Sequence, residues 1–198
     1  MRDKIIKEAI SYIQSLFAGN SDGHDAAHSL RVYHNAERLA AFYPDADQTT
    51  ILLAALLHDA DDDKLFHTEN NANARAFLDS HGIDPEQTEE ICAIINGVSF
   101  RKNQNKRPAS LAAAIVQDAD RLDAIGAVGI ARTFAFGGGK GRPLSDSVKH
   151  FYDKLLRIRD LMNTPEAKRF ADERHACMEQ FLVQLREEAP DLFRFETE

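Results

Sequence analysis

The clearest pattern in the sequence is a run of seven apolar residues, 51–57, that contains no glycine or proline and ends in His58 and Asp59. Such a run is typical of an element that is buried on all sides, either a strand or a helix. Its Leu and Ala content, with β-branching only at Ile51, favours a helix. A histidine and an aspartate at the end of a buried helix are costly unless they are hydrogen-bonded or bind a cation. This stretch therefore predicts a partner for the doublet, and a metal ion is the obvious one.

Helical spacing of apolar residues continues through most of the chain. In the second of these segments, His28 shares one stripe with Val32, Ala36 and Leu39, so we expect its side chain to point inward. No segment shows the alternation of a half-buried strand. The helices that we expect cover approximately residues 5–17, 28–43, 48–57, 69–80, 85–98, 109–128, 148–156 and 165–185.

Two stretches break this pattern. Residues 100–108 are polar and basic and are predicted to form a loop, and residues 137–143 contain four glycines and a proline, which we expect to be irregular. The second stretch predicts either a flexible lid over an anionic substrate or an exposed loop. The pattern as a whole predicts an all-α protein of about eight or nine helices, folded as a single domain over residues 1–198.

Composition narrows the classes of function. The formal net charge of -8 argues against binding to duplex nucleic acid, although a local basic patch can still hold a small phosphorylated ligand. No apolar run approaches the roughly 20 residues that span a bilayer, so we expect no membrane association and a cytoplasmic protein. Cys92 and Cys177 lie in no zinc-binding pattern and are expected to be reduced thiols.

Three of the predicted helices present polar groups where apolar ones are expected. His28 lies on the second, His58 and Asp59 end the third, and Asp118 or Asp120 lies on the sixth. Two imidazoles and two carboxylates suit a transition metal better than calcium, and four protein ligands leave positions for water and substrate. Asp118 and Asp120 diverge by about 200° on a helix, so only one can face the metal, and the bare pattern slightly favours Asp118.

These residues carry a resemblance to a known family. His28, the doublet His58 and Asp59, and Asp120 before Arg121 and Leu122 resemble the signature of the HD-domain metal-dependent phosphohydrolases. The resemblance covers residues from about 20 to 130 and implies a helical HD core on which C-terminal helices in residues 144–188 pack. It implies that Asp120 rather than Asp118 is the fourth ligand. It also implies one divalent cation, Mn, Co, Ni, Fe, Zn or Mg, because residues 95–100 lack the further histidines of binuclear relatives.

An acidic pair follows the doublet. If the third helix continues, Asp62 and Asp63 lie one turn beyond His58 and Asp59, and the resemblance implies that this pair has a general acid/base role. The alternative is a solvated helix end. The cations that we expect to bind substrate phosphate are Arg31, Lys64, Arg121, Lys140 and Arg142.

The function that the resemblance implies is metal-dependent hydrolysis of a phosphoester or phosphoanhydride. Nucleotides are the commonest substrates of this family, so the expected substrate is a small phosphorylated molecule, first a nucleoside mono- or triphosphate and second a hyperphosphorylated guanosine nucleotide. A non-catalytic sensor domain that binds metal or nucleotide is the alternative, and a homodimer is left open.

Overall fold

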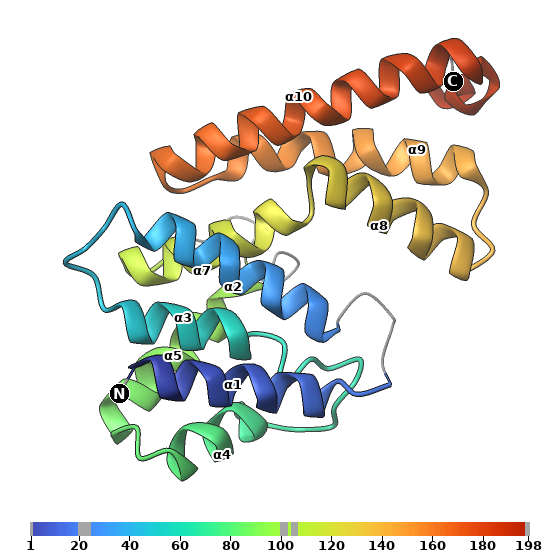
Figure 1. Cartoon of the computed structure of the whole chain (residues 1–198). Helices are drawn as coiled ribbons and strands as arrows, with labels where there is room; N and C mark the ends of the chain where they lie inside the picture. Colours follow the sequence, from blue (N-terminus) through green and yellow to red (C-terminus); the bar gives the residue numbers. More distant parts are fainter. Residues whose placement is uncertain (1, 20–24, 100–102, 104–106, 197–198) are drawn as a thin grey trace. The chain divides into compact units, whose positions relative to one another are not determined.

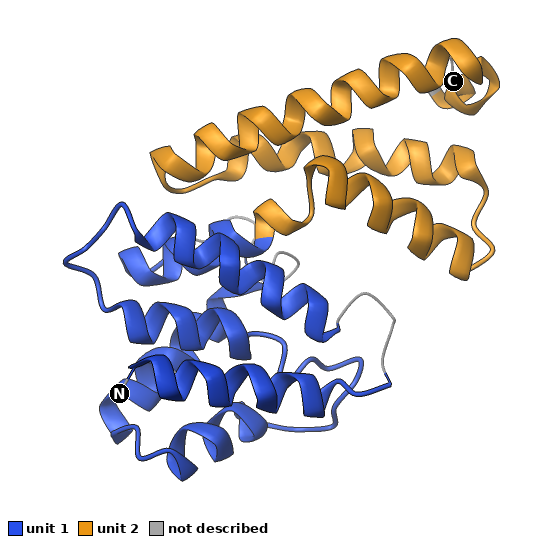
Figure 2. Cartoon of the chain, in the orientation of Figure 1, with its two compact units in different colours: residues 1–120 blue, residues 121–198 orange. Residues whose placement is uncertain are grey.

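Helices account for all of the regular secondary structure in the residues that the computed structural model describes, which are 2–19, 25–99, 103 and 107–196. In this part of the chain there are nine α-helices and two 3-10 helices, and the predicted all-α class is confirmed. The chain divides into two compact units, residues 1–120 and residues 121–198 (Figure 2). That the whole chain folds as a single domain stays a prediction.

The first unit is built around α3, Gln48–Leu57 (Figure 1). Asp47 caps this helix by accepting hydrogen bonds from the backbone N–H groups of Thr49 and Thr50 at 2.9 and 3.2 Å. All residues from 51 to 57 are buried, and α3 packs against α1, α2 and α5. The helices of this unit are α1 Arg2–Leu16, α2 Ala26–Ala40, α3, α4 Ala72–Ser80, α5 Pro85–Val98 and the first ten residues of α7 Leu111–Asp123.

The end of α3 differs from the expectation. The helix stops at Leu57, with His58 as its C-terminal cap residue, and residues 58–61 form turns. Asp62 and Asp63 therefore do not lie one helical turn beyond His58 and Asp59, and that part of the prediction is wrong. The fourth predicted helix also begins later than expected, at Ala72, because Asn70 and Asn71 have φ angles of 55° and 54°, in the left-handed region.

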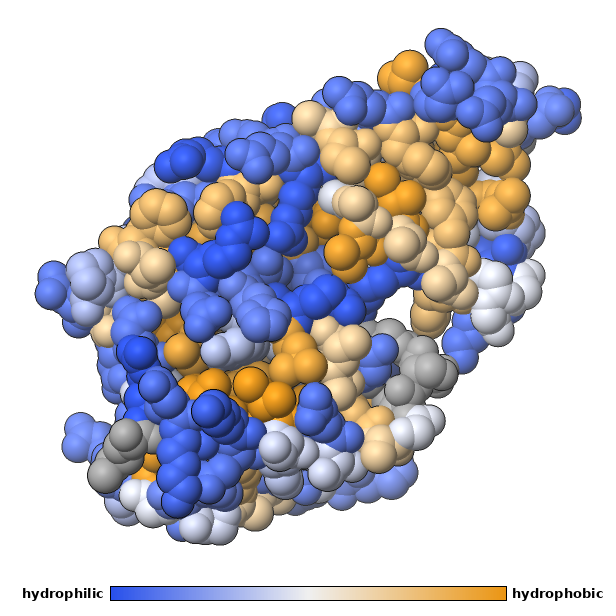
Figure 3. Space-filling model, in the orientation of Figure 1, coloured by the Kyte–Doolittle hydropathy of each residue, from blue (hydrophilic) through white to orange (hydrophobic). Residues whose placement is uncertain are grey.

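The second unit contains α8 Gly126–Gly139, α9 Leu144–Asp153, η1 Leu155–Leu161, α10 Pro165–Glu188 and η2 Pro190–Glu196. Within it, α8 packs against α10 and α9. Apolar side chains also gather on the surface of this unit where α8 lies (Figure 3). On α8, Val128 and Phe136 have exposed side chains.

The prediction that residues 137–143 are irregular is wrong for its first half. Helix α8 continues through Gly137, Gly138 and Gly139, and only residues 140–143 are non-helical, with a turn at residues 140 and 141. Gly137 is buried, and a Cβ there would lie 2.5 Å from Oγ of Ser147 on α9. The absence of a side chain therefore allows α8 and α9 to approach each other closely at this point. The irregular stretch is shorter than a seven-residue lid, and a lid role for it stays a prediction.

One segment predicted as a single helical stretch, residues 109–128, is two helices. Helix α7 ends at Asp123, and α8 begins at Gly126, whose φ of 75° is one that residues other than glycine rarely adopt. None of the described helices is long and apolar enough to cross a membrane.

Candidate metal centre

His28 lies in the first turn of α2. The helix begins after Asp25, whose carboxylate accepts the backbone N–H of His28 at 2.7 Å and so fixes the start of the helix. The imidazole is on the inner stripe of α2, as the spacing predicted, and its side chain is 6% exposed. Its Nε2 atom faces the end of α3.

His58 follows the last residue of α3, where the final carbonyls of a helix need partners from outside the regular helical pattern. Its Nδ1 lies 2.8 Å from the carbonyl oxygen of Ala55. A carbonyl oxygen can only accept, so the proton of the neutral imidazole is on Nδ1 and the lone pair of Nε2 is available to a cation. A backbone bond of this kind commonly orients a metal-binding histidine.

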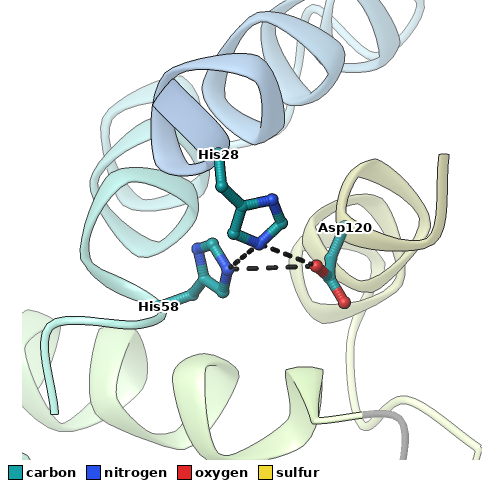
Figure 4. A group of neighbouring side chains, drawn as sticks. All are labelled: His28, His58 and Asp120. Carbon is teal, nitrogen blue, oxygen red and sulfur yellow. Dashed lines mark hydrogen bonds and ion pairs between the residues drawn. The ribbon is translucent and has the colours of Figure 1, made fainter. Parts of the chain in front are cut away.

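Asp120 reaches the two imidazoles from α7. Its Oδ1 atom lies 3.4 Å from Nε2 of His28 and 3.9 Å from Nε2 of His58 (Figure 4). Asp118 is fully buried two residues earlier on α7, on a different face of the helix. The structure thus brings Asp120, the residue that the resemblance implied, to the two histidines, whereas the bare apolar pattern pointed to Asp118.

The backbone next to Asp120 is held by a residue that the sequence analysis did not single out. Asn35, buried on α2, donates from Nδ2 to the carbonyl oxygen of Ala119 at 3.1 Å. Asn35 is seven residues after His28 and therefore on the same face of α2. A buried asparagine at this spacing from a candidate ligand is the only signal that the sequence carries for this bond.

The distances between the donor atoms fit a shared cation. The two Nε2 atoms are 3.2 Å apart, and Oδ2 of Asp59 lies 3.5 Å from Nε2 of His28 and 3.4 Å from Nε2 of His58. Donors about 2.1 Å from one ion are about 3.0 Å apart when adjacent in an octahedron and about 3.4 Å apart in a tetrahedron. His28, His58 and Asp120 can therefore hold a divalent transition metal, with Oδ2 of Asp59 beside both imidazoles as the candidate fourth ligand.

The electrostatic setting of His58 agrees with this arrangement. Burial by itself lowers the pKa of the imidazole, but the carboxylates of Asp59 and Asp120 more than offset that effect, and the pKa of His58 is raised from its ordinary value. The two carboxylates thus favour a positive charge at this point, which a cation can supply in place of a proton.

Asp62 and Asp63, the predicted acid/base pair, lie in the irregular segment after the doublet. The carboxylate of Asp62 is half-buried, and its Oδ1 accepts the backbone N–H of Lys64 at 2.9 Å. Asp63 is exposed. Their part in catalysis stays a prediction.

The predicted phosphate-binding cations have different surroundings. Arg31 is half-buried on α2, three residues after His28, and Lys64 is exposed. Arg121 is buried and donates from Nη1 to the carbonyl oxygen of Leu161 within the second unit. Lys140 and Arg142 also belong to that unit, where both lie over the ring of Phe136. In the basic stretch 100–108, residues 100–102 and 104–106 lie outside the described residues.

Comparison with known proteins gives consistent results. The HD domain family model matches residues 25–125, which hold the four candidate ligands. The uncharacterized protein YpgQ of Bacillus subtilis is 39% identical over 193 residues, with 92% of each chain covered. Its crystal structure in complex with ADP superposes with a TM-score of 0.84 at 36% identity, covering 96% of this chain and 98% of that one.

An HD-superfamily hydrolase from Bacillus thuringiensis superposes with a TM-score of 0.79 at 36% identity, over 95% of this chain and 98% of that one. The family match covers more than half of this chain and contains the residues that form the cluster. The chain therefore belongs to the HD-domain family and has the fold of the HD-superfamily hydrolases.

Proposed function

We propose that this protein is a metal-dependent phosphohydrolase that cleaves a phosphoester or phosphoanhydride bond. The observation that carries the proposal is the convergence of two imidazole nitrogens and two carboxylates, in which each imidazole Nε2 lies 3.2–3.9 Å from the other and from an oxygen of Asp59 and of Asp120. A divalent cation held there would polarise a phosphoryl oxygen and lower the pKa of a water molecule.

The protein's own residues supply the remaining steps. The hydrogen bond to Ala55 fixes the orientation of the His58 ring and would present Nε2 to a bound cation. We assign the proton of the attacking water to Asp62, with Asp63 as the alternative, because both carboxylates lie within four residues of Asp59 in the same irregular segment. Lys64, two residues after Asp62, and Arg31 on α2 are the cations of the first unit that we assign to the substrate phosphates.

We propose a nucleotide as the substrate, first a nucleoside mono- or triphosphate and second a hyperphosphorylated guanosine nucleotide. The relative YpgQ, 39% identical to this chain, has been crystallised in complex with ADP. A nucleoside diphosphate combines a base with a phosphate chain, so its binding to a relative of this similarity supports a nucleotide here.

The test is hydrolysis of a nucleotide panel by the purified chain, loaded in turn with Mn²⁺, Co²⁺, Ni²⁺, Fe²⁺, Zn²⁺ and Mg²⁺. We expect phosphate or pyrophosphate release with at least one metal. Asp59→Ala should reduce the rate and the bound metal in parallel, by roughly 100-fold or more. Retained activity in a metal-free Asp59→Ala variant would exclude the mechanism. Tight nucleotide binding without turnover under any metal would instead identify a non-catalytic sensor.

A further inference from the structure

The N-terminus of α4 is capped by a residue from outside the helix. Its own cap residue, Asn71, is in the left-handed region and makes no side-chain cap bond. Instead the carboxylate of Asp61 accepts the backbone N–H of Asn73 at 2.9 Å through Oδ1 and that of Ala74 at 3.1 Å through Oδ2. The carboxylate therefore satisfies two of the N–H groups that a helix start leaves without partners.

A second bond runs in the opposite direction. Nδ2 of Asn73 donates to the carbonyl oxygen of Ala60 at 2.8 Å, so residues 60 and 61 are tied to α4 by three hydrogen bonds. The carbonyl of Asn73 in turn accepts the hydroxyl of Tyr12 on α1 at 3.1 Å. The segment that follows the His58 and Asp59 doublet is thus attached to α4, which is itself hydrogen-bonded to α1.

This attachment matters because the doublet is not inside a helix. In the turn after Leu57, the backbone N–H of Ala60 donates to the carbonyl oxygen of Leu57 at 3.0 Å, and that of Asp62 donates to the carbonyl oxygen of Asp59 at 3.1 Å. Ligands must be held within about 0.5 Å of a productive geometry, which a short turn does not achieve without support from neighbouring groups. Asp61 is two residues from Asp59 and one residue from Asp62.

We propose that Asp61 is a positioning residue, which acts with Asn73 to hold the turn that carries His58, Asp59 and Asp62 in the geometry that binds the cation. This inference rests on the metal-dependent function proposed above. It separates the acidic run into different tasks: Asp59 lies beside the imidazoles, Asp61 accepts the N–H groups at the start of α4, and Asp62 remains for proton transfer.

Asp84 provides a matched control. Its Oδ1 accepts the backbone N–H groups of Glu86 and Gln87, both at 3.0 Å, and so caps α5 with the same chemistry. None of the four candidate ligands lies on α5, Pro85–Val98. A residue that only caps a helix should behave like Asp84, whereas a positioning residue should also affect the metal.

The experiment measures Co²⁺ binding to the full chain, through the affinity and the visible absorption spectrum of the bound ion, together with the unfolding temperature of the metal-free protein. We expect Asp61→Ala to weaken Co²⁺ binding by about 10–100-fold and to change the spectrum, as the loss of a supporting partner typically does. Asp84→Ala should lower the unfolding temperature to a similar extent but leave Co²⁺ affinity within about twofold.

A second variant, Asn73→Ala, removes the bond to the carbonyl of Ala60 and leaves the carboxylate of Asp61 in place. It should weaken Co²⁺ binding less than Asp61→Ala does, and it decides the question if Asp61→Ala does not fold. Co²⁺ affinity and a spectrum equal to wild type in the folded variants would overturn the proposal for Asp61. A wild-type chain that binds no Co²⁺ would instead overturn the proposed metal-dependent function.

Discussion

At the scale of single residues, the candidate metal centre depends on which nitrogen of His58 carries its proton. The carbonyl of Ala55 lies 2.8 Å from Nδ1 and keeps a proton there, so any second proton must be on Nε2, where the cation would bind. Protonation of His58 and binding of metal therefore exclude one another. The carboxylates of Asp59 and Asp120 favour protonation and metal binding alike, because the proton and the cation would each place a positive charge beside the same two carboxylate oxygens.

We therefore predict opposite pH dependences for metal affinity and for the stability of the metal-free protein. The raised pKa of His58 means that the folded chain holds this proton more tightly than the unfolded chain does. The resulting stability is present below the ordinary pKa of histidine and is lost as the pH rises through the raised value. Metal must displace the same proton, so below the raised pKa the affinity should fall about tenfold per pH unit.

Titration calorimetry across the range of about pH 5.5–8 measures the affinity, and urea unfolding of the metal-free chain over the same range measures the stability. The matched control is His34→Gln, since His34 lies on α2 with a side chain that is 65% exposed. This variant should leave unchanged both the pH dependence of metal affinity and the pH dependence of the stability of the metal-free chain. An affinity for the metal that does not vary with pH would contradict the assignment.

A second prediction separates the two aspartates of α7. Asp120→Asn should weaken metal binding by roughly 100-fold or more, because loss of an outer partner alone typically costs about 10–100-fold. Asp118→Asn makes the same substitution of an amide for a carboxylate at a fully buried position. It should lower the free energy of unfolding, while the metal stoichiometry and the metal affinity remain close to those of the wild type. Metal content by mass spectrometry and the affinity of each variant provide the comparison, and the reverse result would make Asp118 the ligand.

At the scale of elements, α8 shows how packing can overrule local propensity. Three consecutive glycines cost helix stability, yet α8 continues through them to Gly139. Gly129 and Gly137 lie against other groups: a Cβ at Gly129 would lie 2.3 Å from the carbonyl oxygen of Ala124, and one at Gly137 would lie 2.5 Å from Oγ of Ser147. A Cβ at Gly138, in contrast, meets nothing within 4 Å.

These contacts predict opposite effects for two alanine substitutions in α8. Gly138→Ala should raise the free energy of unfolding by about 0.4–1 kcal/mol, because alanine restricts the unfolded chain and favours the helix. Gly129→Ala should lower it by about 1–3 kcal/mol, because the new methyl group forces the backbone at Ala124 to move. Urea unfolding of both variants tests the pair. A stabilising Gly129→Ala would show that the start of α8 is not packed in this way.

At the scale of the whole molecule, all four candidate ligands lie in the first unit, residues 1–120, although they come from α2, α7 and the end of α3. The unfolded chain brings these segments together only transiently, so a cation binds the folded unit far more tightly than the unfolded chain. The cation should also offset the repulsion between Asp59 and Asp120 in a chain of net charge -8.

Adding the preferred metal at about 100 times its Kd should therefore stabilise the first unit by about 2.7 kcal/mol. For a protein of this size that corresponds to a rise of about 5–10 °C in the unfolding temperature. Scanning calorimetry with and without a chelator measures the shift. The Asp120→Asn variant serves as the control and should show little of it, and an equal shift in that variant would place the cation elsewhere.

Much of this organisation could be predicted from the sequence because it depends on local periodicity. Residues 51–57 are buried as a helix, His28 points inward, and no strand occurs in the part of the chain that the structure describes, as the apolar spacing predicted. The order and spacing of His28, the doublet His58 and Asp59, and Asp120 also indicated the HD-domain family. Such patterns are encoded over a few turns, where side-chain direction follows from helical geometry alone.

The tertiary structure decided what depends on contacts between distant segments. Asp120 meets the imidazoles where α7 packs against α2, and Asn35 there donates to the carbonyl of Ala119, 84 residues away, whereas the apolar pattern of α7 alone slightly favoured Asp118. Asp61 caps α4 because Asn73 and Ala74 face it across a turn, although its sequence context is a run of similar aspartates. Helical periodicity determines which face a residue occupies, but the partner across that face is determined only when the helices pack.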